Sequence, residues 1–225
     1  MKTTILFSNM LGDITSDNCV NECYFNENVS NLLMKYVKDN SNLVFINAPG
    51  LKNDYLYYEA TVNAFKKLNI NFASAIELSN ETEISTLTEF PKSDRVYYLM
   101  GGNPIAQKEI IEKFNLTQEL KNYEGVVIGF CAGAINLSKY SIITTDRDFD
   151  IPFYYNGINR VNMVVEPHFE VDESEFYNNR MKELNDFCNK LNEDITAIPD
   201  LSCVLINDEI IEYYGEIHFI KKEEK

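Results

Sequence analysis

A cysteine stands where a predicted buried strand meets a predicted helix. The apolar run Val126 to Phe130 leads into Cys131, and glycines lie two positions before and two positions after it, at Gly129 and Gly133. Glycines with this spacing permit a tight turn that lifts the side chain between them above a sheet. The partial positive charge of a helix N-terminus also favours the thiolate, the nucleophilic form of cysteine. The sequence therefore predicts a nucleophile at Cys131, with the backbone N–H of Ala132 placed to donate to an oxyanion.

A second glycine turn follows the preceding predicted strand. The run Val96 to Met100 leads into Gly101-Gly102-Asn103-Pro104. Adjacent turns of a parallel sheet open on the same edge, where ligands bind, so Gly102 is expected to supply a second oxyanion N–H. Asn103 is expected to cap a helix that starts at Pro104. Each turn alone can be explained by the packing of a strand on a helix, since cysteine and small residues are often buried. The presence of both turns favours a catalytic site.

The general base has two candidates, because the chain contains only two histidines. His168 follows the apolar run Val164 to Pro167, and a histidine at the end of a strand is better placed for a site than one inside it. His218 falls in a predicted C-terminal strand near the tail. We therefore expect His168 to move the proton for Cys131.

The elements that must position these residues alternate as in an α/β protein with a mostly parallel sheet and helices on both faces. Apolar runs predict strands at Ile5 to Phe7, Leu43 to Ile46, Phe72 to Ile76, Val96 to Met100 and Val126 to Phe130. Helical spacing predicts helices after a cap at Asn53-Asp54, from Pro104, and from Glu173 to Leu191. Short strands are expected at 195–198, 203–206, 209–214 and 216–220, the middle pair forming a hairpin. Residues 9–28 are expected to be the least structured.

Composition narrows the classes of function. Of the 225 residues 45% are hydrophobic, and no linker or repeat divides the chain, so a single domain over 1–225 is expected. A net charge of −15 disfavours nucleic acid and membrane partners. Five scattered cysteines and the absence of a signal-like start favour a reducing compartment, the cytoplasm. Cys19 and Cys23 have no further ligands at metal-binding spacing, so neither a metal nor a cofactor is expected.

The motifs Gly101-Gly102-Asn103, Gly129-Phe130-Cys131-Ala132-Gly133-Ala134 and Pro167-His168-Phe169, in this order, resemble the aspartyl dipeptidase (dipeptidase E) and cyanophycinase family. The resemblance implies a class I glutamine amidotransferase-like, flavodoxin-like fold with a C-terminal β-hairpin region. It also implies hydrolysis of an amide or peptide bond in a small acidic peptide. The family's nucleophile is a serine within G-x-S-A-G-A, and Cys131 stands at that position. A thiol forms acyl intermediates through the same geometry.

The acid that completes a triad has three candidates. The resemblance points to Asp200 first and to Asp146 second. Glutamine amidotransferases take the acid two residues after the histidine, which is Glu170 here, and strand alternation would keep Glu170 on the side of His168. Most of the 35 carboxylates in the chain are expected to be simply solvated.

The resemblance also suggests substrate-binding residues. It matches Arg180 to an arginine in the corresponding helix, where a guanidinium can hold a substrate carboxylate through two parallel hydrogen bonds. Asn103 is the second candidate. For any one of the four arginines of the chain, a solvated surface position is the alternative.

Two other functions remain open from the sequence. A glutaminase-type amidase would need a synthetase partner, and this chain contains no such domain. A DJ-1-like redox or binding protein would oxidise the thiol instead of acylating it, but that family places a glutamate at the end of the first strand, where this chain has Phe7-Ser8-Asn9. The expected partner is a small peptide or amide substrate, and a homodimer is possible.

Overall fold

The computed structural model describes residues 1–11, 23–50, 55–146, 148–172 and 174–223. Several features considered above lie outside these ranges, namely the cap at Asn53-Asp54, Cys19, Glu173, Arg147 and most of the segment 9–28. Among the helices that the structure describes, none combines the length and the apolarity that a membrane crossing requires.

The centre of the molecule is a seven-stranded, mostly parallel sheet in the order β11-β10-β1-β5-β4-β2-β3. Its five parallel strands are β1 (Thr3–Phe7), β5 (Val126–Phe130), β4 (Arg95–Leu99), β2 (Asn42–Ile46) and β3 (Ser74–Leu78). Every residue of β1, β2, β4 and β5 is buried, as expected for strands covered on both faces. The hairpin β10 (Cys203–Asn207) and β11 (Ile210–Tyr214) adds two antiparallel strands at one edge. The predicted α/β class and the C-terminal hairpin are thus confirmed.

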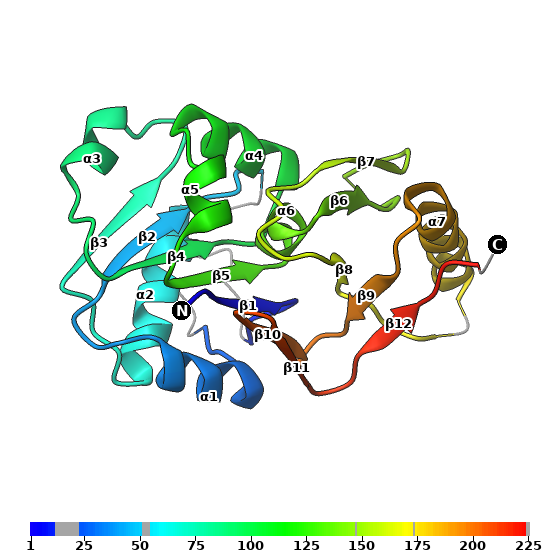
Figure 1. Ribbon diagram of the computed structural model, residues 1–225, viewed down its shortest axis with the longest axis horizontal. Coiled ribbons are helices and arrows are strands. Elements are labelled where there is room, and N and C mark those ends of the chain that lie inside the picture. Colours follow the sequence, from blue (N-terminus) through cyan, green and yellow to red (C-terminus); the bar gives the residue numbers. More distant parts are fainter. Residues whose placement is uncertain (12–22, 51–54, 147, 173, 224–225) are drawn as a thin grey trace.

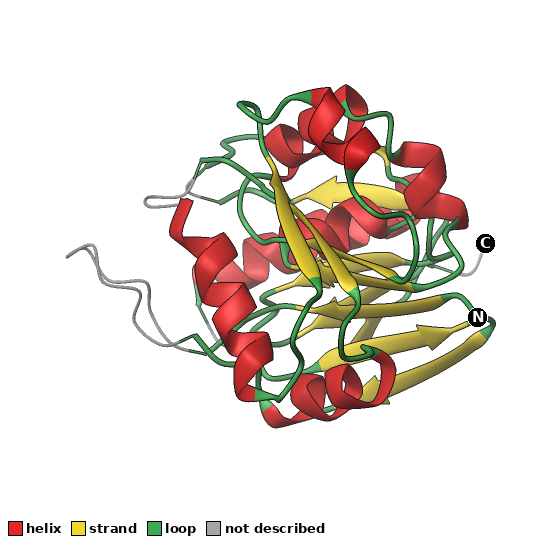
Figure 2. Cartoon of the chain, turned by 90° about the vertical axis from the view of Figure 1, so that its left-hand side faces the viewer, coloured by secondary structure: helices red, strands yellow, loops and turns green. Residues whose placement is uncertain are grey.

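Helices cover both faces of this sheet (Figures 1 and 2). One face packs against α1 (Glu27–Tyr36) and α2 (Tyr55–Lys67). The other packs against α3 (Ile84–Glu89), α4 (Pro104–Lys113), α5 (Thr117–Asn122) and α6 (Ala132–Leu137). The sequence analysis did not anticipate α1, which begins inside the segment expected to be least structured. The side chain of Asn26 caps this helix by accepting from the N–H of Val29, which is a strong local start signal.

A second, three-stranded sheet extends the molecule. It has the order β12-β9-β8 and consists of β8 (Val164–Pro167), β9 (Ile195–Ile198) and β12 (His218–Ile220). The long helix α7 (Glu175–Leu191) and the hairpin of β6 (Tyr140–Ile143) and β7 (Phe153–Asn156) pack against it around a separate apolar cluster. In Figure 1 this part lies to the right of the seven-stranded sheet, beyond the ends of β1 and β5.

The strand β3 is shifted by two residues from its predicted position. The third strand of the parallel set spans Ser74–Leu78, whereas the apolar run predicted 72–76. Phe72 lies before the strand, and its ring packs edge-on against Phe65 of α2, with ring centroids 5.0 Å apart. The sequence prediction therefore started this strand too early, at an aromatic loop residue that packs against a helix.

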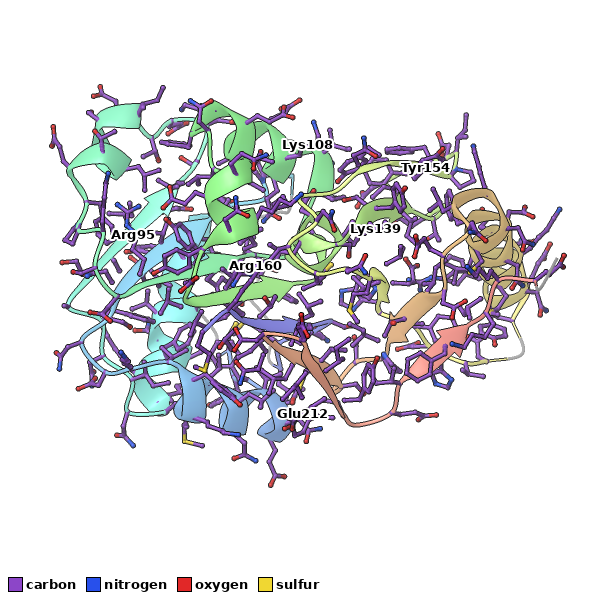
Figure 3. The ribbon with its side chains drawn as sticks, in the orientation of Figure 1. Arg95, Lys108, Lys139, Tyr154, Arg160 and Glu212 are labelled. Carbon is purple, nitrogen blue, oxygen red and sulfur yellow. The ribbon has the colours of Figure 1, made fainter. Side chains whose placement is uncertain are left out.

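Two arginines are buried, contrary to the surface position considered for them. Arg95 and Arg160 are each 4% exposed (Figure 3). Arg160 donates to Thr4 Oγ1 and to carbonyl oxygens of residues 3, 120, 123 and 125, and burial lowers its pKa to about 10. Arg95 binds carbonyl oxygens of residues 87, 90 and 91 and the carboxylate of Glu119. Each buried guanidinium group therefore has several oxygen acceptors, most of them backbone carbonyls, as a buried charge requires.

Candidate active site

Cys131 occupies the turn between β5 and α6 in a backbone conformation that L-residues rarely adopt, with φ at 48° and ψ at −106°. Its N–H extends the sheet by donating to the carbonyl oxygen of Phe7 at 2.9 Å. A Cβ atom at Gly129 would lie 2.9 Å from the nitrogen of Ala134, and one at Gly133 would lie 2.3 Å from the carbonyl oxygen of Leu99. Both glycines are therefore sterically required for this tight turn.

The second glycine turn lies beside the thiol. A Cβ atom at Gly101 would lie 3.2 Å from Cβ of Cys131. Gly102 has φ at 135°, and a Cβ there would lie 2.3 Å from the carbonyl oxygen of Ala48. Within the described residues, the backbone N–H groups of Gly102 and Ala132 have no hydrogen-bond acceptor. The structure thus brings two available donors to the edge of the sheet where Cys131 lies.

His168 and Asp200 come together because their strands run side by side. β8 and β9 are parallel, with Pro167 opposite Ile198, so the residues that follow the two strands share one edge. Nδ1 of His168 lies 2.8 Å from Oδ1 of Asp200. The other carboxylate oxygen, Oδ2, accepts from the side-chain amide of Asn9 at 3.0 Å.

The pair shifts the protonation of both groups. Burial favours the neutral imidazole, but hydrogen bonds with Asp200 and Cys131 and the charges of both residues outweigh burial and raise the pKa of His168 to about 10. The hydrogen bond from His168 lowers the pKa of the Asp200 carboxyl against the opposing effect of burial, and the amide of Asn9 adds to it. At neutral pH the site therefore contains an imidazolium held by a carboxylate.

The other two candidate acids lie apart from the imidazole. Asp146 is exposed, and its Oδ1 accepts from the backbone N–H groups of residues 148 and 149, which shapes its own loop. Glu170 is also exposed. His168 has φ at 52°, which breaks the strand, so the alternation that would have kept Glu170 on the side of His168 does not continue past it.

The two candidate substrate ligands have protein partners instead. The three guanidinium nitrogens of Arg180 all donate to the chain, Nε to Glu166 Oε1, Nη1 to the carbonyl oxygen of His168 and Nη2 to that of Pro167, each at 2.7 Å. Asn103 caps α4 as predicted, because its Oδ1 accepts from the N–H groups of residues 105 and 106. Hydrogen bonds within the protein therefore compete with a role of Arg180 and Asn103 in substrate binding.

Cys131 and His168 both line one cavity of about 250 Å³. It is lined by polar groups that include Gly102, Cys131, His168 and Arg180, and by an apolar wall of Ile135, Ile142, Ile143, Phe149 and Phe176. A shallower hollow of about 590 Å³ adjoins it and shares Asp146, Phe176 and Arg180. In the described part of the chain, no three His, Cys, Asp or Glu side chains are grouped to hold a metal ion.

Sequence reasoning missed three residues around the site. Ser8 donates its hydroxyl to the carbonyl oxygen of Ile198, and Asn9 binds Asp200, so both fix the end of β9. Glu166 is buried on β8 and binds Arg180. Two signals could have found them: polar residues directly after the apolar strand β1, and a single carboxylate inside the apolar run 164–167.

The fold and the site together define an α/β protein with a thiol on a strained strand-to-helix turn and, in the same cavity, a histidine that is paired with an aspartate. Comparison with family models places the chain in a known family: residues 14–214 match the model of peptidase family S51, so the protein belongs to that family. A structure of similar fold is a crystal structure of a protein from Listeria monocytogenes EGD-e assigned as a peptidase E. That match has a TM-score of 0.60 at 15% sequence identity and covers 95% of this chain and 98% of the other. No curated protein matches the sequence.

Proposed function

We propose that this member of family S51 is a cysteine-nucleophile peptidase or amidase that works through an acyl-enzyme. The observation that carries the proposal is that Cys131 and His168 line one cavity, while Nδ1 of the same histidine lies 2.8 Å from Oδ1 of Asp200. The backbone strain at Cys131 supports it, because rare conformations of this kind persist where the surrounding structure holds a functional group in place.

The chemistry follows from these positions. The thiolate of Cys131 attacks the carbonyl carbon of the substrate, a C–S bond forms, and the N–H groups of Gly102 and Ala132 bind the oxyanion. The His168 imidazolium gives its proton to the leaving nitrogen as the C–N bond breaks, which leaves a thioester. Water then attacks the thioester, His168 takes its proton, and the acid and the thiolate are released. Asp200 orients the imidazole throughout.

The cavity favours a small substrate. Its volume of about 250 Å³ is slightly below the range of roughly 300–1,000 Å³ that is common for small-molecule sites. Resemblance to the dipeptidase E family favours a peptide with an acidic residue, which we propose as the substrate class to test first.

The test is a hydrolysis screen with aspartyl dipeptides, isoaspartyl peptides, neutral dipeptides and glutamine. Wild type is compared with Cys131→Ala and with Cys203→Ala, a control that removes a fully buried thiol. Turnover of one peptide class that is lost in Cys131→Ala and kept in Cys203→Ala supports the proposal. Turnover that survives in Cys131→Ala would overturn it, and glutamine as the best substrate would replace the peptidase with an amidase.

A further inference from the structure

Arg180 of α7 reaches across to β8 and binds three consecutive residues at its end. Its guanidinium donates to the side chain of Glu166 and to the carbonyl oxygens of Pro167 and His168, at 2.7 Å in each case. The Arg180 side chain is 14% exposed, so these contacts are largely shielded from water. A planar fork of donors can hold several acceptors at once, which the single ammonium of a lysine cannot do.

The residue that most needs such support is His168. Its φ of 52° lies in the left-handed region, which is unfavourable for an L-residue. Within the described residues, the carbonyl oxygen of His168 has one donor, Nη1 of Arg180. The neighbouring N–H of Phe169 returns to the sheet by donating to the carbonyl oxygen of Ile198. Arg180 thus binds the backbone at His168, the first residue after the regular strand β8.

Glu166 anchors the arginine. This carboxylate is 2% exposed and accepts from both Arg180 and the hydroxyl of Thr144, the latter at 2.9 Å. Burial raises the pKa of Glu166, while the charge and hydrogen bonds of Arg180 oppose that effect. A buried ion pair with a second hydrogen bond has one well-defined geometry, because either partner left alone would be a costly buried charge.

We propose that Arg180, anchored by Glu166, is a positioning residue that holds the backbone of His168 so that its ring meets both Cys131 and Asp200, and that it is not a ligand of a substrate carboxylate. The inference rests on the proposed function only for its kinetic readout. The charged or titratable groups around the imidazole are Cys131 from the β5–α6 turn, Asp200 after β9, Glu166 of β8 and Arg180 of α7.

The first test is substrate-free. The rate of alkylation of Cys131 by the neutral reagent iodoacetamide is compared between wild type, Arg180→Lys and the control Lys182→Gln, which removes a positive charge from the adjoining hollow. We expect Arg180→Lys to slow alkylation of Cys131 by about tenfold or more, because a misplaced imidazolium supports the thiolate less well. Lys182→Gln should leave the rate unchanged. General loosening of the fold would instead speed alkylation of the buried Cys188 and Cys203.

The second test uses kinetics on the peptide that wild type hydrolyses best. Positioning predicts that Arg180→Lys lowers kcat by about tenfold to a hundredfold with little change in KM. Glu166→Gln weakens the anchor and should lower kcat less, in the same direction. If Arg180 bound substrate, Arg180→Lys would raise KM for acidic peptides and leave alkylation unchanged, and Glu166→Gln would free the guanidinium and lower that KM. Either of those results overturns the proposal.

The two proposals fail separately. A wild-type protein that hydrolyses none of the peptides contradicts the proposed function, while the alkylation rates still decide the role of Arg180. If Arg180→Lys does not fold, the folded variant Glu166→Gln carries the same comparison. An unchanged alkylation rate in Glu166→Gln then counts against positioning.

Discussion

The environments of the thiols differ in a way that decides their reactivity. Burial raises the pKa of Cys203 to about 12 and that of Cys188 to about 11, so both are protonated thiols at neutral pH. Cys23 is also buried, whereas Cys131 is partly exposed in the cavity. We expect brief treatment with limiting iodoacetamide to label Cys131 first, as measured by mass spectrometry. Faster labelling of Cys23 or Cys19, with Cys131 unmodified until the chain unfolds, would contradict a nucleophile at this turn.

The removal of Cys131 should abolish catalysis. In a catalytic triad the nucleophile acts as part of a unit, and its loss costs on the order of 10⁶ in turnover. We expect a loss of this size in Cys131→Ala, measured as kcat on the best peptide, with an unchanged unfolding midpoint. A much smaller loss would mean that water is activated without a covalent intermediate.

The three acids should differ in importance, and the contacts in the structure favour Asp200. Asp200 touches the imidazole, whereas Asp146 and Glu170 are exposed and the contacts of Asp146 are with its own loop. Loss of the orienting acid costs about 10⁴ in a serine triad, and less is expected here because a thiol is intrinsically a stronger nucleophile than a hydroxyl and depends less on its base. Asp200→Asn should therefore slow turnover more than Asp146→Asn, and Glu170→Gln least. Equal rates for wild type and Asp200→Asn would remove Asp200 from the triad.

The sequence indicated Cys131 and His168 because each directly follows an apolar run, and parallel strands bring such positions to one edge. Asp200 was indicated by the family resemblance. The sequence could not indicate what Arg180 binds. That contact depends on how α7 crosses β8, and helical spacing shows which residues share a face but not which strand they meet. In the structure the guanidinium of Arg180 binds the side chain of Glu166 and the carbonyl oxygens of Pro167 and His168.

At the scale of the elements, the strands β4 and β5 and the helix α6 pack closely against one another. A Cβ on Gly133 would collide with the backbone of Leu99, which cannot move without disturbing β4. Gly133→Ala should therefore destabilise the protein by roughly 1–3 kcal/mol, the usual cost of overpacking, as measured by urea unfolding.

The matched control is Gly125→Ala. There the added Cβ would meet the ring of Tyr123, a side chain that can shift. We expect a smaller loss of stability in this variant. A Gly133→Ala protein as stable as wild type would show that β4 and α6 can separate freely.

Element prediction succeeded for the strands buried on both faces and for the short strands near the C-terminus, and it missed the hairpin of β6 and β7. The parallel strands appeared in the sequence as apolar runs of three to five residues. The sheet of β8, β9 and β12 depends on pairing between residues 164–167 and 195–198, and local sequence does not encode such distant pairing. The helix α1 was missed because a polar segment concealed the cap at Asn26.

For the whole molecule, the titration of His168 predicts how stability depends on pH. The folded pKa of about 10 lies above the value of about 6.5 expected in the unfolded chain. A raised histidine pKa contributes stability that is fully present below about pH 6.5 and is lost as the pH rises towards about 10. The lowered pKa of Asp200 acts in the opposite direction, and its contribution is lost only in acid.

We therefore expect the free energy of unfolding of wild type to fall between neutral and alkaline pH more steeply than that of His168→Gln. Urea titrations of both proteins at several pH values measure the difference. Parallel curves for the two proteins would show that the imidazole is not charged in the folded state.

The residues that we propose for catalysis belong to two separate sheets. Cys131, Gly102 and Ala132 follow strands of the seven-stranded sheet, whereas His168 and Asp200 follow β8 and β9 of the three-stranded one. Hydrogen bonds from Ser8 and Asn9 join the end of β1 to the end of β9 beside the cavity. In the proposed mechanism, the alignment of the thiol with the imidazole therefore depends on how the two sheets are held together and not on either sheet alone.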